Sequence, residues 1–579
     1  MNKQYLDLME KTLSAYTDEH IIRYFNDVKK DGLREHGFPR LTANIGILIA
    51  NGRRRDLLAL FCEMMELCCK TIPNVKAAND FSVREIISCL MEVEKNATVS
   101  QEDVQRWKGY LSTIDPKTCY NRFAEKPTDA VRNWALFTGV SEYFRQKMGL
   151  CNSAEFIDIQ IASQLQWIDE NGMYMDNAES DINQPIVYDL VPRGLFSLLL
   201  HAGYRGKYYT TIDDILKKAG LITLNMQSAS GEVAFGGRSN QFLHNEAWLA
   251  TIFEYEATRY QREGNYKLAG KFKAGALRAL SIAELWLSKK PITHIKNRFS
   301  IHSKYGCETY AYFDKYMISA ASFFYVASLF CDDTIQPIEE REEPVIWSTS
   351  KYFHKTFVKT DEYSLEFDTN AEAHYDGSGL GRIHKKGAPS SICLSTPFTK
   401  APYYYCGNWL NSTEITIPSA GKQVNSAQFS ICPAIKGGDG QWLFGADSKT
   451  KYTLIENTVE KDKAKVAFQC ILEEGTKVTF SAIVRNESVC VEVETEEDKE
   501  VGIALPVFDF DGETHTKICY KADKVQVEYE NWVCEYSSER ICDLEEYFAN
   551  RNGIYKGYIA TGKGKVSVEI KIYPLKKEI

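Results

Sequence analysis

The sequence predicts a multidomain protein of α and β structure, with an N-terminal α/α toroid (an incomplete helical barrel) followed by an antiparallel β-sandwich. Up to about residue 333, apolar residues recur at positions i, i+3, i+4 and i+7, which is typical of one buried helix face. An acidic, proline-containing segment without periodicity comes next. Beyond it apolar residues alternate with a period of two, which indicates half-buried strands.

We therefore expect a helical catalytic domain over residues 1–333, a linker over 334–348 and a sandwich over 349–579. No short sequence period is visible, so a regular solenoid is not expected and helical hairpins packed side by side fit better. The helical pattern covers 41–50, 57–72, 82–93, 130–148, 154–168, 192–202, 212–218, 241–260, 266–287 and 315–330. The strand pattern runs from KTFVKT to KVSVEIKIYP and predicts a large antiparallel sandwich.

The composition is that of an ordinary globular protein, with 44% apolar and 25% charged residues in 579. The net charge is −9 and basic tracts are absent, which argues against nucleic acid or an anionic membrane as the partner. Apolar runs of about 18 residues and a signal-peptide core are both lacking, and the 16 cysteines are scattered without CxxC spacing. We expect a cytoplasmic protein with reduced thiols. The oligomeric state is not indicated.

The stretch GEVAFGGRSNQFLHNEAW, residues 231–248, is the strongest candidate for a site in the helical domain. Gly236 and Gly237 allow backbone angles that are closed to other residues, and a helix is expected to begin here with Ser239 or Asn240 as its N-cap. Polar side chains cluster at the start of this helix: Arg238, Asn240, Gln241, His244, Asn245 and Glu246. The alternative is a well-capped helix with a solvated first turn.

Three more stretches of the helical domain carry candidate residues. Asn133 and Trp134 open a long helix, where Trp134 could stack on a sugar ring or pack between helices. Tyr188 ends a long polar loop and could face a cavity or close the helix packing. Tyrosines and a histidine cluster before the last helix, where they could transfer protons or fill the core: His302, Tyr305 and Tyr310.

In the sandwich, Glu372, His374 and Asp376 alternate along an expected strand, which would place all three side chains on one face. Such a row could bind a divalent metal or contribute an acid–base group to a cleft. It could equally be a hydrogen-bonded ladder on the surface.

Helical hairpins, a linker and a sandwich with these polar clusters resemble the toroid-plus-sandwich polysaccharide lyases, which include heparinase II/III-like, alginate and chondroitin lyases. The resemblance covers the whole length as architecture. Its specific residues are Asn133–Trp134, the NGMYMD…VYDL loop, SNQFLHNE, the tyrosines near residue 310 and AEAHYDGSG. The sequence departs from the HxHxD-like row of the heparinase relatives, because Glu372 stands where a first histidine would be.

The resemblance implies β-elimination at a uronic acid in a uronate-containing oligosaccharide, with no cofactor needed for the elimination. It implies that Arg238, Asn240 and Gln241 neutralise the carboxylate, that His244 and Tyr310 serve as base and acid, and that Tyr188 is the next candidate. His374 could reach the site from the sandwich. Asn133, Trp134, His302 and Tyr305 would contact substrate, and a divalent metal could bind at Glu372, His374 and Asp376.

A cytoplasmic lyase would meet imported oligosaccharides, so exo action is expected, including on a linkage between a terminal sugar and glucuronate. The runner-up is a glycoside hydrolase on a similar toroid, which needs two carboxylates flanking the scissile bond. Its candidate carboxylates are Asp176, Asp189, Glu246 and Glu308. A third reading is a non-catalytic carbohydrate-binding protein.

Overall fold

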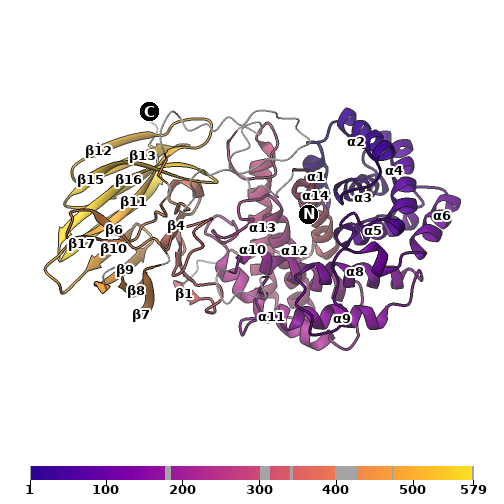
Figure 1. Ribbon diagram of the computed structural model, residues 1–579, viewed down its shortest axis with the longest axis horizontal. Helices are drawn as coiled ribbons and strands as arrows, with labels where there is room; N and C mark the ends of the chain where they lie inside the picture. The colour runs from indigo at the N-terminus through magenta and orange to yellow at the C-terminus, as the bar shows by residue number, and fades with distance from the viewer. Residues whose placement is uncertain are drawn as a thin grey trace.

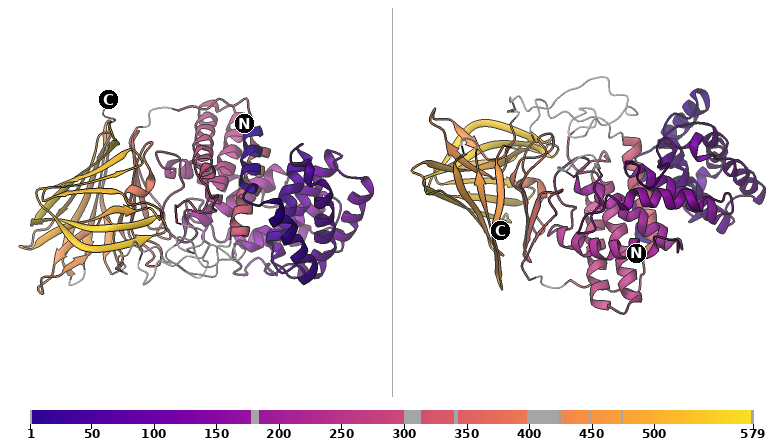
Figure 2. Two further views of the ribbon diagram at one scale, coloured as in Figure 1. Left: turned by 90° about the horizontal axis from the view of Figure 1, so that it is seen from above. Right: turned by 60° about the horizontal axis from the view of Figure 1, so that its bottom comes forward.

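The computed structural model describes residues 2–176, 184–299, 313–339, 343–397, 424–425, 427–447, 449–472 and 475–576. A helical domain occupies one end of the molecule and antiparallel sheets the other (Figure 1), which confirms the predicted fold class. The two parts lie side by side along the long axis in two further views (Figure 2). Among the described helices, none is both long and apolar enough to cross a membrane.

The helices of the first part are α1 (Asn2–Leu13), α2 (Asp18–Asp31), α3 (Gly37–Ala50), α4 (Leu58–Thr71), α5 (Val83–Lys95), α6 (Gln101–Ser112), α7 (Pro116–Cys119), α8 (Trp134–Lys147), α9 (Ala154–Leu165), α10 (Ile186–His201), α11 (Tyr209–Met226), α12 (His244–Arg262), α13 (Tyr266–Ser288) and α14 (Phe313–Phe330). Short 3₁₀ turns precede some of them, including η3 (Asn79–Phe81) ahead of α5.

Six of these helices form an inner ring. In the order α3, α5, α8, α10, α12 and α14, each contacts the next, and α14 returns to contact α3. An outer helix covers most of them: α4 packs on α3, α9 on α8, α11 on α10, α13 on α12 and α1 on α14. This arrangement explains why α12 is buried along nearly its whole length, since it has neighbours inside and outside the ring. The inner helices share one direction, because an outer helix returns the chain between them.

Close approach within the ring depends on small residues. Gly194 of α10 faces Trp248 of α12, and a Cβ at this glycine would lie 2.5 Å from the indole ring. The indole fills the space that the missing side chain leaves, and Trp248 is 2% exposed. A larger residue at position 194 would therefore push α10 and α12 apart.

The strands are β1 (Val345–Ser348), β2 (Lys355–Lys359), β3 (Tyr363–Asp368), β4 (Gly379–Lys385), β5 (Pro433–Lys436), β6 (Trp442–Phe444), β7 (Lys451–Glu460), β8 (Lys463–Ile471), β9 (Lys477–Arg485), β10 (Val489–Glu494), β11 (Glu500–Phe510), β12 (Lys517–Lys521), β13 (Lys524–Tyr529), β14 (Trp532–Ser537), β15 (Ile541–Asn550), β16 (Gly553–Lys563) and β17 (Lys565–Pro574). All ladders between these strands are antiparallel.

The strands form three sheets. Their orders are β1-β2-β3-β4, β12-β13-β14-β17-β10-β9-β8-β7 and β15-β16-β11-β5-β6. The expected alternation is clear in β10, where Val489, Val491 and Val493 are buried and the residues between them are not fully buried. These valines belong to the core that the sheets share.

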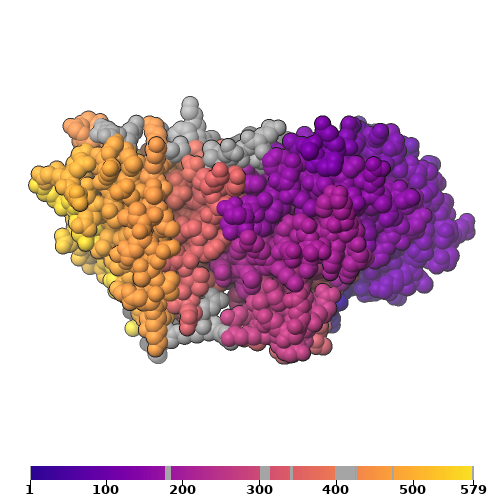
Figure 3. Space-filling model, turned by 90° about the horizontal axis from the view of Figure 1, so that it is seen from below, coloured from indigo at the N-terminus to yellow at the C-terminus, as the bar shows by residue number. Residues whose placement is uncertain are grey.

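The four-stranded sheet lies at the junction between the two parts. Its coral surface sits between the magenta helical domain and the orange outer strands in the space-filling view (Figure 3). β1 occupies the last four residues of the expected linker, because Val345–Ser348 pairs with β2 from Val345↔Lys359 to Ser348↔Thr356. The sheet therefore begins within the predicted linker, and only the acidic segment before Val345 is left of that linker.

Candidate active site

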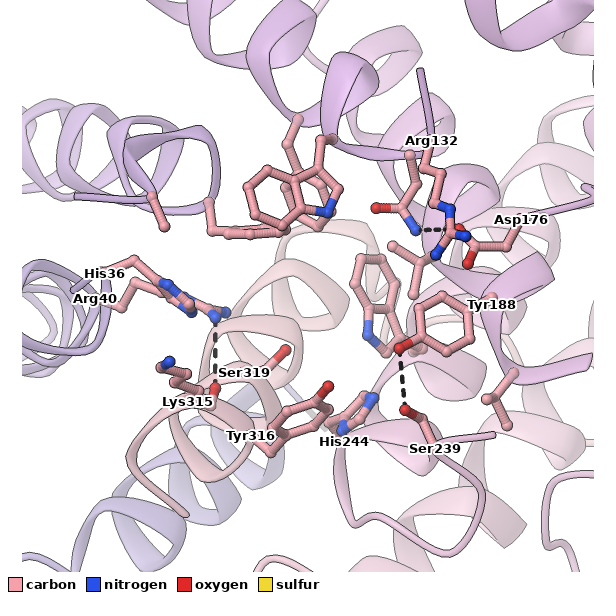
Figure 4. Close-up of a pocket in the computed structure, with 18 of the residues that line it drawn as sticks. His36, Arg40, Arg132, Asp176, Tyr188, Ser239, His244, Lys315, Tyr316 and Ser319 are labelled. Carbon is pink, nitrogen blue, oxygen red and sulfur yellow. Dashed lines mark hydrogen bonds between the residues drawn. The ribbon is translucent and has the colours of Figure 1, made fainter. Parts of the chain in front are cut away.

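A cavity of about 550 Å³ lies at the N-terminal ends of the six inner helices. Each of these helices, or the turn just before it, contributes residues to the wall: His36 and Arg40 for α3, Phe81 for α5, Asn133 and Trp134 for α8, Tyr188 for α10, His244 for α12, and Lys315, Tyr316 and Ser319 for α14. In Figure 4 the labelled side chains, among them His36, Tyr188 and Tyr316, converge on the cavity from opposite sides. The volume falls within the range of small-molecule sites, roughly 300–1,000 Å³.

The wall of this cavity is positively charged. Among the described lining residues are five cationic side chains, Arg40, Arg122, Arg132, Arg238 and Lys315, against two carboxylates. The N-terminal ends of the inner helices add partial positive charge, since their first N–H groups point along the helix axis towards the cavity. The geometry therefore suits a ligand that carries negative charge.

A glycine-rich loop from the helical domain reaches the cavity and is fixed by the sandwich. Both carboxylate oxygens of Asp376 accept hydrogen bonds from the Gly237 N–H, at 3.0 and 2.9 Å, and Arg551 donates to the Gly237 carbonyl at 2.9 Å. Gly236 has φ of 98°, and a Cβ there would lie 2.6 Å from Oδ2 of Asp376. The loop needs glycine at 236 because both its backbone angle and its neighbour exclude a side chain.

The same loop is held at two points nearer its start. The N–H of Phe235 donates to Glu366 at 2.6 Å, and the buried Arg382 donates to the Val233 carbonyl at 3.0 Å. Arg382 also pairs with Glu366 and, at 3.2 Å, with Glu232. Two carboxylates and a carbonyl offset part of the cost of burying this guanidinium, whose Nε has no hydrogen-bond partner among the described residues.

The side chain of Arg238, which follows Gly237 in the same loop, takes part in a chain of hydrogen bonds in the cavity wall. Its guanidinium is 2.5 Å from Oδ2 of Asp176, and the Asn133 amide donates to Oδ1 of the same carboxylate at 2.7 Å. Burial raises the pKa of Asp176, while the charges of Arg238 and Arg132 oppose that rise. Arg238 also lies over the Tyr188 ring, 4.5 Å from its centroid.

Tyr188 presents its phenol to the cavity from the first turn of α10. Its Oη lies 3.0 Å from Oγ of Ser239, a hydrogen bond in which either oxygen could donate (Figure 4). Ser239 adopts a left-handed backbone conformation with φ of 60°. This strain is tolerated because the clamped glycines precede it, and it turns the serine hydroxyl towards Tyr188.

His244 is the first residue of α12 and lies against the cavity with 7% of its surface exposed. Burial, with the nearby charge of Arg40, lowers the pKa of His244 to about 3, so the ring is neutral near pH 7. Its centroid is 5.0 Å from that of Tyr316. Its Nδ1 is buried and has no hydrogen-bond partner within the described residues.

Trp134 forms the opposite wall, half-buried at the start of α8. Its ring meets Phe81 edge-on at 4.6 Å, and the Arg122 guanidinium lies 4.9 Å from the ring centroid. The structure thus brings together five residues predicted from sequence: Asn133, Trp134, Tyr188, Arg238 and His244.

Asn240 and Gln241 do not line this cavity. The segment around them is a turn rather than a helix, with φ of 70° at Gln241. Lys296 N–H donates to the Gln241 carbonyl at 2.7 Å, and Leu243 N–H donates to the His294 carbonyl at 2.8 Å. Asn240 donates to the Ala234 carbonyl at 2.7 Å and accepts from Gln241 at 2.9 Å. The expected N-cap at Ser239 or Asn240 is therefore wrong, since α12 begins at His244.

The expected strand around Glu372, His374 and Asp376 is also wrong. These residues form a turn, in which the N–H groups of Tyr375 and Asp376 both donate to the Glu372 carbonyl. His374 is exposed and does not line the cavity, whereas Asp376 is buried against Gly237. No three His, Cys, Asp or Glu side chains of the described chain gather as metal ligands would. The three candidates thus do not fit a metal.

Three predicted residues, His302, Tyr305 and Tyr310, lie outside the described residues, as does Glu308. Several lining residues were not singled out from the sequence. Tyr316 ends the stretch NRFSIHSKYGCETYAYFDKY that contains the predicted tyrosines, so its position at the start of a helix was the available signal. No local sequence pattern marks Arg40 as a site residue. Its orientation depends on an ion pair across the ring, in which its Nε lies 2.9 Å from Oε1 of Glu85 in α5.

The sequence matches no model of a known protein family and no curated protein. Some solved structures are similar to this chain. A chondroitin AC lyase from Streptomyces coelicolor A3 has a TM-score of 0.48 at 10% identity, covering 100% of this chain and 82% of that one. A heparan sulfate lyase, HepC, from Pedobacter heparinus has a TM-score of 0.36 at 9% identity over 96% and 88%. A Paenibacillus xanthan lyase has 0.48 at 7% over 93% and 53%.

All three of these structures are lyases by name, and each has a TM-score under 0.5 against this chain.

Proposed function

We propose that the protein is a lyase that cleaves a uronate-containing glycan by β-elimination in the cavity between the inner helix ends. The observation that carries the proposal is the composition of this cavity. Five cationic side chains and six helix N-termini surround the phenol of Tyr188 and the neutral ring of His244. A carboxylate-bearing sugar fits the charge, and the hydroxyl and imidazole fit proton transfer and hydrogen bonding.

In the reaction a base removes the proton from C5 of the uronate, the C5–H electrons form a C4=C5 double bond, and the C4–O bond breaks. The leaving oxygen takes up a proton. The C5 proton becomes acidic enough only when the carboxylate charge is neutralised, because the intermediate places negative charge on the carboxylate oxygens. We assign that neutralisation to Arg238 and Arg132. Asp176 pairs with Arg238, and Asn133 donates to Asp176.

We assign proton transfer to Tyr188, with Tyr316 on the other side of His244 (Figure 4) as the second phenol. His244 was the expected base, but a pKa of about 3 makes its ring a weak proton acceptor near pH 7. General bases work best when the pKa lies near the operating pH. The neutral imidazole instead suits a hydrogen bond to the substrate from the part of the ring that lines the cavity.

The hydrolase alternative is less well supported by the described residues. It needs two carboxylates about 5–10 Å apart across the scissile bond. Asp176 is committed to Asn133 and Arg238, while Asp189 pairs with Arg193, and Glu246 with Lys296, away from the cavity wall. Glu35 is the other carboxylate on the wall and pairs with Lys315 at 2.9 Å.

The test is an ultraviolet screen against oligosaccharides derived from alginate, chondroitin, heparan sulfate and a rhamnose-capped glucuronate. The 4,5-unsaturated uronate made by elimination absorbs in the ultraviolet, so wild type should raise the absorbance on at least one substrate and Tyr188→Phe should not. Reducing sugar without absorbance would identify a hydrolase. Saturable binding of these oligosaccharides without any product would identify a binding protein.

A further inference from the structure

A second cavity, of about 460 Å³, lies between the helical domain and the sandwich. The end of α13 and residues 296–298 form one side, and the β13–β14 hairpin with the turn before η4 (Ser390–Ile392) forms the other. Gln241 lines this interdomain cavity, whereas Ser239 and His244 line the first one. The loop that carries Arg238 therefore separates the first cavity from the interdomain cavity.

Aromatic rings from both domains face the interdomain cavity. Trp286 comes from α13, Tyr529 from β13 and Trp532 from β14, and both indoles are half-buried. Gly387 lies against Trp532, and a Cβ there would lie 3.4 Å from the indole. The Lys289 ammonium covers one face of Trp286, 3.8 Å from the ring centroid. The remaining half-exposed ring surface can pack against the C–H face of a sugar.

The charges of the interdomain cavity are balanced. Three cationic and three acidic side chains line it, and they pair within the described structure. Lys296 lies 2.5 Å from Glu246, Arg298 pairs with Glu530, and Lys289 lies 3.8 Å from Glu530. In contrast to the first cavity, these charges do not select an anion.

Two buried polar atoms of this wall, Nε of Arg298 and Oδ1 of Asn552, have no hydrogen-bond partner among the described residues, although Nε lies 3.5 Å from Oδ2 of Asp511. Asn552 is 6% exposed, and its Oδ1 accepts no hydrogen bond from the described residues. Its amide nitrogen makes only a long contact, 3.5 Å, to the Lys296 carbonyl. A buried acceptor without a donor is costly, so a ligand that donates a hydrogen bond there is favoured.

We propose that the interdomain cavity is a second carbohydrate site, which binds an uncharged sugar residue between the two domains. The aromatic rings contact the sugar face, and a sugar hydroxyl donates to Oδ1 of Asn552. The site is independent of the elimination chemistry, since an uncharged sugar carries no carboxylate and cannot be eliminated as a uronate.

The test is isothermal titration calorimetry of the full-length protein with four uncharged disaccharides: cellobiose, lactose, maltose and N,N′-diacetylchitobiose. At least one should bind saturably to wild type. Trp286→Ala and Trp532→Ala should each weaken that binding about tenfold or more, since each removes a contacting ring. Trp532→Phe, which keeps a ring, should weaken it less and guards against loss of folding.

Trp442→Ala is the matched control, because Trp442 of β6 is also half-buried but lines neither cavity. This variant should bind the disaccharide as tightly as wild type does. The proposal is overturned if none of the four disaccharides binds saturably, if binding survives both tryptophan variants, or if Trp134→Ala alone abolishes it. Tyr188→Phe separates the two proposals, because it should lose elimination and keep disaccharide binding.

Discussion

Asp376 of the sandwich accepts the main-chain N–H of Gly237 with both carboxylate oxygens, at 3.0 and 2.9 Å, across the boundary between the two domains. The next two residues along the loop, Arg238 and Ser239, line the cavity of the helical domain. Although His374 does not reach the cavity, the sandwich therefore contributes to the site by holding the loop that carries these side chains.

Replacing Asp376 by Asn should weaken this hold, because the amide offers one acceptor instead of two and adds a donor that faces an N–H. Hydrogen bonds to charged groups contribute about 1.5–3 kcal/mol, so we expect a loss of unfolding free energy of that size in urea denaturation. Displacing Arg238 should also lower kcat/KM about 10- to 100-fold.

Asp439→Asn is the control for this substitution, because Asp439 also accepts a main-chain N–H, from Gln441 at 3.0 Å, but is exposed. It should change neither quantity appreciably. Equal effects of the two substitutions would show that the contact with Gly237 has no special role.

Gly236→Ala should destabilise the protein, because the new Cβ would lie 2.6 Å from Oδ2 of Asp376 at a φ of 98°. The strained backbone alone costs about 1–3 kcal/mol. Gly264→Ala provides the backbone control, since Gly264 has φ of 79° and nothing within 4 Å of a Cβ. Thermal unfolding should show a larger drop in Tm for Gly236→Ala, and equal drops would disprove the close contact.

Tyr188→Phe should leave the fold intact and remove elimination activity, because only the phenol oxygen beside Ser239 is lost. Proton transfer by a positioned side chain contributes about 10²–10⁴-fold, so kcat in the ultraviolet assay should fall by that factor. Tyr143→Phe removes a half-buried phenol of α8 that lines neither cavity and should retain full activity. A Tyr188→Phe enzyme with wild-type kcat would refute our assignment of the proton-transfer residue.

His244 should make the folded protein less stable as the pH falls. Its pKa is about 3 in the fold and about 6.5 in the unfolded chain, so between these values only the unfolded state binds the proton. From pH 6.5 to pH 5 wild type should therefore lose about 2 kcal/mol relative to His244→Asn in urea denaturation.

Nitrogen chemical shifts of the labelled imidazole give a direct measurement of the same property. They should report a neutral His244 at pH 5. A titration midpoint near 6.5 would contradict the burial that we describe for this ring.

Five residues that the sequence predicted for the site line the cavity. Asn133, Trp134, Tyr188, Arg238 and His244 were recognisable because each stands at a loop-to-helix transition, where polar and aromatic residues have no role in the helix core. Asn240 and Gln241 looked equivalent to them, but pairing with residues 294–296 turns this segment away from the cavity. Local pattern does not contain that long-range pairing.

The sequence by itself determined the fold class and the order of the helical domain and the sandwich, because hydrophobic periodicity specifies which face of each element is buried. Tertiary structure alone decided which side chains meet. The ring brings Arg40 of α3 and Lys315 of α14 to one cavity wall, although 275 residues separate them. It also decides that Asp376 accepts the Gly237 N–H instead of standing in a row along a strand. Such contacts depend on how the elements pack, which no local stretch of sequence encodes.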